Sequence, residues 1–167
     1  MRDRENDMEH ATIFDSLKAD HDRQRSMLSM IAEANPADRP ALFEQFRIDV
    51  SAHAAAEEQT LYATMMADPA LQDDARHSVS EHKEIDDMIV AIAKTEPGSD
   101  AWTQAFEELR TEYDHHITEE EEEMFPAAAG ELTEAKAEEL AAVFEERKPE
   151  EAEKAEVIDP AEKEERD

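Results

Sequence analysis

The chain has 167 residues, 17 of them basic and 46 acidic, so its formal net charge is −29 with histidine neutral, and this charge disfavours nucleic acid and anionic membranes as partners. Its length suits one domain with short tails, and a hydrophobic content of 40% is enough for a core, which argues against a wholly disordered chain. Two glycines are too few for a sheet-rich fold or a phosphate-binding loop, and the absence of cysteine excludes disulfides, thiolate nucleophiles and iron–sulfur clusters.

Residues 1–10 are charged and lack the apolar segment of a secretory signal, so we expect them to form a lead-in to a cytoplasmic protein. Beyond them no apolar run approaches the length of a membrane span. Prolines and one Pro-Gly pair separate four stretches that are long enough for several helical turns, at about 11–34, 40–67, 70–95 and 100–125. Because the connections have about five residues each, the sequence predicts an all-α fold, an up-down-up-down four-helix bundle.

A fifth, shorter helix is predicted from about 133 to 147. Thr133 is a suitable N-cap, and Phe144 belongs to the apolar edge of this segment. The chain that follows is charged and has almost nothing to bury, so we expect a disordered or frayed acidic tail over residues 148–167. The bundle and its fifth helix are thus expected to occupy residues 11–147.

The four predicted helices form two pairs with the same plan. The second and fourth segments match at an offset of 63 residues, which aligns the His-x-x-x-Glu motif of His53 and Glu57 with that of His116 and Glu120. The first and third segments match at an offset of 61, which aligns two pairs of an acidic residue followed by histidine. The four histidines and the two motif glutamates continue the apolar stripes of their helices at steps of three and four, so they are expected to face the interior.

Buried carboxylates and imidazoles are costly unless they are paired or bind a metal, so an inward-facing set of them predicts a metal site. The set consists of His21, His53, Glu57, His82, His116 and Glu120. Imidazole with carboxylate suits iron, manganese or zinc, but six ligands are too many for one tetrahedral zinc. They suit two octahedral ions bridged by both carboxylates. With an oxide or hydroxide bridge, about two of roughly twelve positions remain for a small molecule.

Other histidines near this set leave alternatives open. His77 lies five residues before His82, which rotates it by about 140° along a helix, so we expect it on the surface unless it supplies a fifth imidazole. His115 and Glu119 form a pair that competes with His116 and its glutamate. The register of the apolar residues favours His116 as the inward-facing histidine.

Further residues have two interpretations each. Asp20 and Glu81 precede predicted ligands, so they either orient imidazoles or lie on the surface. Tyr113 is expected in the core, where a phenol near an iron pair could tune oxygen chemistry. A ferritin-like site requires Glu-x-x-His motifs in register on two helices. Glu112 with His115 matches that spacing, and Asp74 with His77 is only a loose variant of it.

Four motifs carry a resemblance to a known family: LKADHDRQRSML, HAAAEEQTLY, SEHKEIDDMI and HHITEEEEEMFP. With them the chain resembles the bacterial hemerythrin-like (HHE cation-binding) family over about residues 11–147. The resemblance implies a non-haem di-iron centre in a four-helix bundle, with the ligand roles on the six inward-facing residues. It also implies that the centre binds or senses dioxygen, nitric oxide or peroxide, or holds iron, with zinc or manganese as substitute metals.

The sequence departs from the similar animal oxygen-carrying hemerythrins at two places. Ser78 stands where those proteins have a fifth histidine, and Glu120 follows His116 by four residues where they have an aspartate after five. Reversible oxygen carriage is therefore not assumed. Two other functions remain open, a catalase-like or oxidase-like enzyme that uses the same centre and a metal-free interaction bundle. Monomer and homodimer are both compatible with the sequence.

Overall fold

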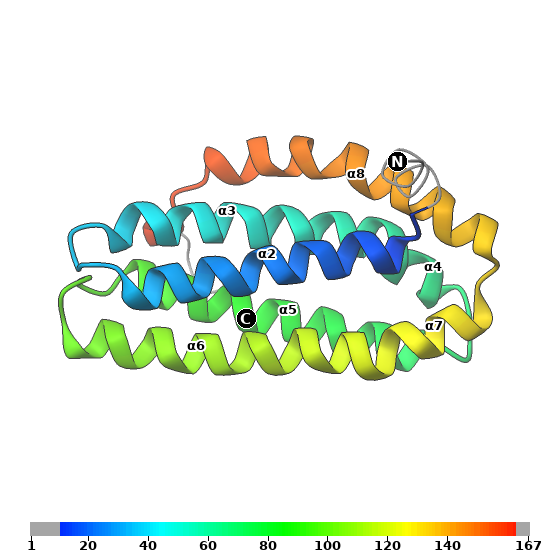
Figure 1. Cartoon of the computed structure of the whole chain (residues 1–167), viewed down its shortest axis with the longest axis horizontal. Helices are drawn as coiled ribbons and strands as arrows, with labels where there is room; N and C mark the ends of the chain where they lie inside the picture. Colours follow the sequence, from blue (N-terminus) through cyan, green and yellow to red (C-terminus); the bar gives the residue numbers. More distant parts are fainter. Residues whose placement is uncertain (1–10, 163–167) are drawn as a thin grey trace, which may run out of the picture.

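The computed structural model describes residues 11–162, and in that range it contains helices and no strand. Four long helices run alongside one another as an antiparallel bundle (Figure 1). They are α2 (Ile13–Glu33), α3 (Arg39–Glu57), α5 (Gln72–Ala93) and α6 (Asp100–Glu119). The predicted all-α, up-down-up-down architecture is confirmed. The lead-in predicted over 1–10 lies outside the described residues.

Hydroxyl side chains fix where several helices begin. The Oγ1 atom of Thr12 accepts a hydrogen bond from the backbone N–H of Asp15 at 3.3 Å, and the Asp15 carboxylate accepts one from the backbone N–H of Thr12 at 3.1 Å. The Ser99 hydroxyl accepts a hydrogen bond from the backbone N–H of Trp102 at the start of α6, and Thr133 caps the last long helix as predicted. Each cap occupies backbone donors that the first helical turn leaves free, so these boundaries are encoded locally.

The apolar core has two parts, one toward each end of the bundle. The first includes Leu17, Leu61 and Phe125, and the second includes Phe46 and Ile89. Along each helix the predicted inward-facing polar residues fall between residues of the two parts. The core therefore encloses a polar layer at mid-bundle and shields it from solvent at both ends.

A single wide turn begins at the end of each His-x-x-x-Glu motif. The π-helices η1 (Glu58–Tyr62) and η2 (Glu120–Met124) interrupt the segments predicted as continuous helices, which resume as α4 (Ala63–Met66) and α7 (Phe125–Glu131). A π-turn adds a residue to the helical repeat and is frequent at functional sites. It brings Tyr62 and Phe125, which are 63 residues apart, into the interior next to the polar layer.

The fifth helix is longer than the sequence predicts. It is α8 (Glu134–Glu156), and it lies along α3 and α2 on the outside of the bundle (Figure 1). The prediction of a disordered or frayed tail from residue 148 is therefore wrong up to residue 156, and a short 3₁₀ turn, η3 (Pro160–Glu162), contacts α5. Residues 163–167 lie outside the described range.

Long-range contacts explain why this acidic segment is ordered. The Lys148 ammonium group lies 2.8 Å from the buried Asp20 carboxylate, which draws the middle of α8 onto α2. The Arg47 guanidinium donates to the backbone carbonyls of Ala155 at 2.9 Å and Ile158 at 3.2 Å. These hydrogen bonds satisfy carbonyls at the C-terminal end of α8, and composition alone does not reveal them.

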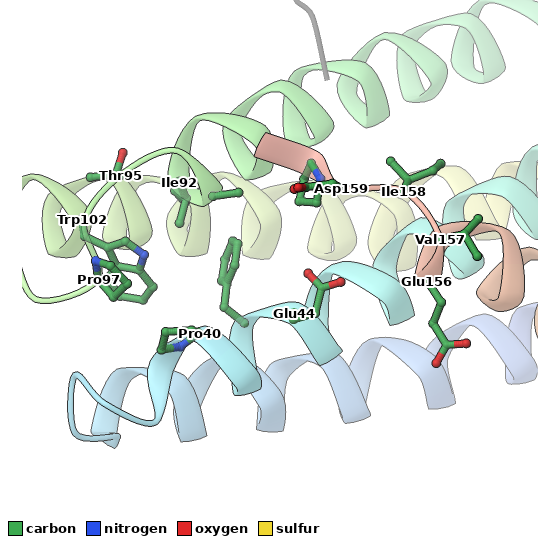
Figure 2. Close-up of a pocket in the computed structure, with 13 residues that line it drawn as sticks. Pro40, Glu44, Ile92, Thr95, Pro97, Trp102, Glu156, Val157, Ile158 and Asp159 are labelled. Atoms are coloured by element: carbon green, nitrogen blue, oxygen red, sulfur yellow. The ribbon is translucent and has the colours of Figure 1, made fainter. Parts of the chain in front are cut away.

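A cavity of about 430 Å³ opens at the end of the bundle away from the polar layer (Figure 2). Pro40, Trp102 and Ile158 line it, together with acidic residues and without any histidine. None of the described helices combines the length and apolar character needed to cross a membrane. The polar layer, rather than this cavity, carries the groups with metal-binding chemistry.

Candidate metal centre

The six predicted site residues meet in the polar layer. His21 and His82 come from α2 and α5, His53 and Glu57 from α3, His116 from α6 and Glu120 from the first position of η2. Five of these side chains are almost fully buried, and that of His82 is 8% exposed. The structure thus brings together every residue that the sequence placed in the set.

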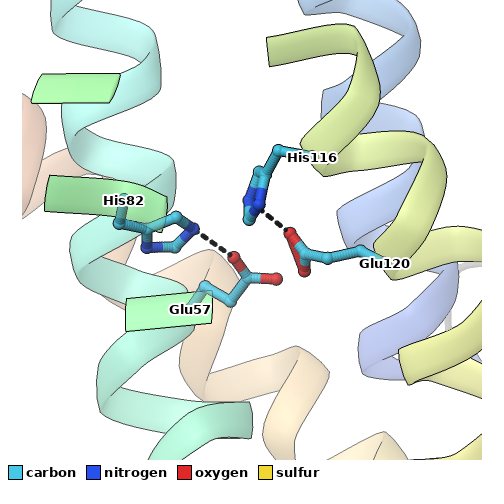
Figure 3. A group of neighbouring side chains, drawn as sticks. All are labelled: Glu57, His82, His116 and Glu120. Carbon is cyan, nitrogen blue, oxygen red and sulfur yellow. Dashed lines mark ion pairs between the residues drawn. The ribbon is translucent and has the colours of Figure 1, made fainter. Parts of the chain in front are cut away.

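Each carboxylate faces two imidazoles. Glu57 Oε1 lies 3.3 Å from Nε2 of His82 and 3.7 Å from Nε2 of His53. Glu120 Oε1 lies 2.8 Å from Nε2 of His116 and 4.0 Å from Nε2 of His21. Figure 3 shows the two glutamates pointing toward each other between His82 and His116, and one atom of each of these four side chains lies within 4.8 Å of the others. The cluster therefore consists of two adjacent half-sites, each with one carboxylate and two imidazoles.

A carboxylate on a neighbouring segment holds the outer nitrogen of every one of these imidazoles. The Nδ1···O pairs are His21–Glu121 at 2.8 Å, His53–Asp20 at 2.9 Å, His82–Glu58 at 3.1 Å and His116–Glu81 at 3.1 Å. Since an ionised carboxylate only accepts, Nδ1 carries the proton, and in a neutral imidazole the Nε2 lone pair is left facing inward. Metal-ligating histidines are typically oriented in this way.

The supporting carboxylates link the four helices in a closed ring. Asp20 and Glu81 hold the histidine of the next helix rather than the adjacent histidine, because neighbouring residues on a helix point about 100° apart. Their predicted alternative, a surface position, is therefore wrong. Sequence analysis missed Glu58 and Glu121, which directly follow Glu57 and Glu120 at the same offset of 63. The repeat contained this signal, but a run of five acids from 119 to 123 resembles a solvated helix face.

Buried polar atoms that lack a hydrogen-bond partner indicate whether this cluster fits a cation. Among residues 11–162, six buried side-chain nitrogen or oxygen atoms have no hydrogen-bond partner. Five of them belong to the cluster, namely Nε2 of His21 and His53, both oxygens of Glu57, and Oε1 of Glu120. Each such atom costs about 1–3 kcal/mol when left unpaired, and a cation would satisfy lone pairs from all of them. Imidazole nitrogen with carboxylate oxygen fits iron, manganese or zinc.

Without a cation the half-sites differ electrostatically. Burial, and next the charge of Glu120, hold the pKa of Glu57 well above its ordinary value. Burial acts in the same direction on Glu120, but the ion pair of its Oε1 with His116 Nε2, 2.8 Å away, holds the pKa of Glu120 well below the ordinary value. Burial lowers the pKa of His53 to about 4, whereas the contacts with Glu120 and Glu81 outweigh burial and raise the pKa of His116 to about 9. A neutral half-site therefore adjoins an ion-paired one.

A tyrosine that the sequence analysis missed lies at the centre. The Tyr62 hydroxyl donates to Glu120 Oε2 at 3.1 Å and lies 3.3 Å from His82 Nε2. Tyr113 is in the core as predicted, but its hydroxyl donates to Gln24, so it does not bond to the centre. The π-turn, which the sequence analysis did not predict, determines which tyrosine reaches the polar layer.

The aromatic residue after each π-turn breaks the symmetry of the repeat. Phe125, which aligns with Tyr62, stacks against His21 with ring centroids 6.0 Å apart, and Tyr62 packs against His82 at 5.2 Å. Ser78, at the position of the fifth histidine of animal hemerythrins, is buried, and its hydroxyl donates to Met124 Sδ at 3.7 Å. One half of the centre thus has a phenol where the other half has a hydrocarbon ring.

The competing interpretations of the remaining histidines are also resolved. His77 and His115 are on the surface, with 59% and 67% of their side chains exposed, so neither joins the buried cluster. His116 is the inward-facing histidine of its pair. The ferritin-like alternative is excluded for Glu112 and His115 because His115 points outward.

Comparisons with known proteins bear on this architecture. A family model described as the hemerythrin HHE cation binding domain matches residues 12–128, which span the four bundle helices and end before α8. A search of curated proteins finds no match. Among solved structures the chain is similar to a hemerythrin HHE cation binding domain-containing protein from Mycobacterium kansasii, with a TM-score of 0.78 and 22% identity over 86% of this chain and 89% of that one. At that identity the likeness shows a shared fold.

Proposed function

Because the chain belongs to the hemerythrin HHE cation-binding domain family, we propose that its buried cluster is a non-haem di-iron centre that binds or senses dioxygen, nitric oxide or peroxide, or holds iron. The observation that carries this proposal is the set of five unpartnered buried atoms, all on predicted ligands. Four carboxylates already fix the outer nitrogens of the imidazoles, so the inner nitrogens are held in position for a ligand role.

The division into half-sites supports two ions rather than one. Each half-site offers two imidazole nitrogens and one carboxylate, and the two carboxylates lie close enough to bridge neighbouring ions. Four imidazoles and two bidentate carboxylates supply about eight of the roughly twelve positions of two octahedral ions. With an oxide or hydroxide between the ions, about two positions stay open for a small molecule. When bound, iron would supply those open positions and its redox chemistry.

A small cavity next to the centre favours a small, weakly polar ligand. It has a volume of about 40 Å³ and is lined by His53, His82 and Tyr113 together with aliphatic side chains such as Val50 and Ile85. A larger cavity of about 330 Å³ shares several lining residues with it, including His82, and opens toward the surface between α3 and α5. The space of about 40 Å³ next to the centre suits a molecule of two or three atoms and is too small for an extended organic substrate.

Metal analysis and spectroscopy test the proposal directly. The purified protein is loaded anaerobically with ferrous iron, and we expect about two iron ions at the buried centre of each chain and a visible spectrum that changes on addition of dioxygen or nitric oxide. His53→Ala should lose iron, whereas His115→Ala, which removes an exposed histidine one residue from His116, should retain it. A protein that holds no stoichiometric iron after reconstitution would refute the di-iron centre. Stoichiometric zinc or manganese from cells would refute the identity of the metal.

One observation favours a catalytic alternative, a catalase-like or oxidase-like enzyme. The Tyr62 phenol is buried and in contact with Glu120 and His82, which places a redox-capable side chain at the centre. Peroxide consumption by the iron-loaded protein is then expected to fall in Tyr62→Phe and to vanish in His53→Ala. Equal rates in the native protein and the two variants would remove this alternative.

A further inference from the structure

A second group of histidines and carboxylates gathers on the surface where α5 meets α6. His77 and Glu81 lie four residues apart on α5, and His115 and Glu119 lie four apart on α6. Nε2 of His77 is 3.4 Å from Glu81 Oε1 and 3.5 Å from Glu119 Oε1, and Nε2 of His115 is 3.3 Å from Glu119 Oε2. We refer to these four residues as the outer cluster. The Glu119 carboxylate contacts His115 on its own helix and His77 on the neighbouring helix, so it links the two histidines of the outer cluster.

We propose that the outer cluster is a second divalent-cation site, which supplies cations to the buried centre. Its donors are imidazole nitrogens and carboxylate oxygens, and one atom each of His77, Glu81 and Glu119 lies within 4.8 Å of the others. This donor set suits first-row ions such as Fe²⁺, Co²⁺ or Zn²⁺ better than Ca²⁺ or Mg²⁺, which prefer oxygen ligands alone. The supply role rests on the proposed function of the buried centre, whereas cation binding by the outer cluster does not.

A cavity lies between the outer cluster and Glu120 of the buried centre. It has a volume of about 60 Å³, room for water or a single ion, and its lining includes His77, Glu119 and the buried Glu120. Oε1 of Glu120 is one of the interior atoms without a hydrogen-bond partner. This oxygen lies 2.8 Å from His116 Nε2, so a cation in the cavity would be one carboxylate away from the buried centre.

Glu81 belongs to both sites. Its Oε1 atom accepts the hydrogen bond from Nδ1 of His116 at 3.1 Å and lies 3.4 Å from Nε2 of His77. A single carboxylate oxygen thus touches one histidine of the outer cluster and one of the buried centre. Coordination of an ion by the outer cluster would therefore take place one side chain away from the centre that the ion is to occupy.

The charge of the cavity between the outer cluster and Glu120 favours cations over neutral molecules. Five carboxylates line it, and among the described residues that line it there is no lysine or arginine. A cleft lined by one sign of charge raises the local concentration of the opposite ion and its rate of association. The small cavity beside His53 and His82 is mostly apolar instead. Cations and small apolar molecules therefore have separate approaches to the buried centre.

Zinc titration of the native chain and three variants tests whether the outer site exists, because Zn²⁺ is not redox active. The native chain is expected to bind one equivalent more, as measured by calorimetry and equilibrium dialysis, than the variant His77→Gln/His115→Gln. That substitution leaves the net charge unchanged when the histidines are neutral, so a lost equivalent reports ligation. Glu57→Gln/Glu120→Gln, which removes the buried carboxylates, should retain the outer equivalent. Glu139→Gln, at an exposed position on α8, is the control and should bind as the native chain does.

Loading kinetics test the supply role. Anaerobic Co²⁺ uptake by the buried centre, followed by visible absorption, should slow by about tenfold in His77→Gln/His115→Gln and reach the same final occupancy of the buried centre. Circular dichroism verifies that each variant is folded.

Each outcome is decisive for one part of the proposal. An unchanged zinc stoichiometry in His77→Gln/His115→Gln would overturn the outer site, and so would loss of the outer equivalent from Glu57→Gln/Glu120→Gln. An unchanged Co²⁺ uptake rate would overturn the supply role. If the native chain bound a single equivalent that the His77→Gln/His115→Gln variant lacked, the outer site would be supported while the proposed buried centre failed.

Discussion

Replacing Glu57 by glutamine should change stability in opposite directions in the metal-free and metal-loaded protein. Both oxygens of this buried side chain lack a hydrogen-bond partner, and the side chain faces a second buried carboxylate, Glu120. Without metal, an amide of the same shape relieves the conflict between two acids. With metal bound, the same change removes a negatively charged ligand, so the variant loses part of the stability that binding supplies.

The magnitude in the metal-free protein follows from the pKa of Glu57, which burial and then the charge of Glu120 hold well above the ordinary value of 4.5. Above pH 4.5 the unfolded chain releases this proton and the folded chain retains it, so stability falls as pH rises. At pH 7 the loss is at most about 3 kcal/mol, since each pH unit contributes about 1.4 kcal/mol. Glu57→Gln should recover up to that amount at pH 7 and almost nothing at pH 4.5.

Thermal unfolding with and without Zn²⁺ measures both expected changes in stability, the gain without metal and the loss with metal. For a chain of this size we expect the metal-free melting temperature to rise on the order of 5–10 °C at pH 7. At a zinc concentration about 100 times the dissociation constant, binding stabilises the native protein by about 2.7 kcal/mol, and the variant should lose most of this. Glu139→Gln, on the surface of α8, serves as the control. A variant that is destabilised without metal, or as stable as the native protein with it, would refute the assignment of Glu57 as a buried cation ligand.

Three further substitutions probe the contacts around the centre. Asp20→Asn weakens the acceptor for Nδ1 of His53 and should reduce metal affinity by about 10- to 100-fold in a chelator competition; unchanged affinity would mean that this hydrogen bond does not orient the ring. Tyr62→Phe removes a buried hydrogen bond and should lower the free energy of unfolding by about 1 kcal/mol in urea denaturation, and no change would contradict that bond. Arg47→Met should speed amide hydrogen exchange near Ala155 without changing metal stoichiometry, whereas unaltered exchange would show that other contacts hold the end of α8.

The fold and the set of inward-facing polar residues were readable from local pattern. A period of 3.6 residues determines which side chains share a face, so the spacing of His53 and Glu57 within an apolar stripe already indicated that both face inward. The offset of 63 residues then assigned the same role to His116 and Glu120. Proline positions and a cap such as Thr133 were equally local signals for where helices begin.

The sequence by itself therefore determined the helices, their inward faces and the six polar residues that meet in the core. Only the tertiary structure decided that Asp20 supports His53 on the next helix, that the π-turn brings Tyr62 rather than Tyr113 to the centre, and that Lys148 holds the middle of α8 against α2. The physical reason is that helical periodicity fixes the direction of a side chain relative to its own axis. Its partner depends on the order, rotation and spacing of neighbouring helices, which packing sets over the whole chain.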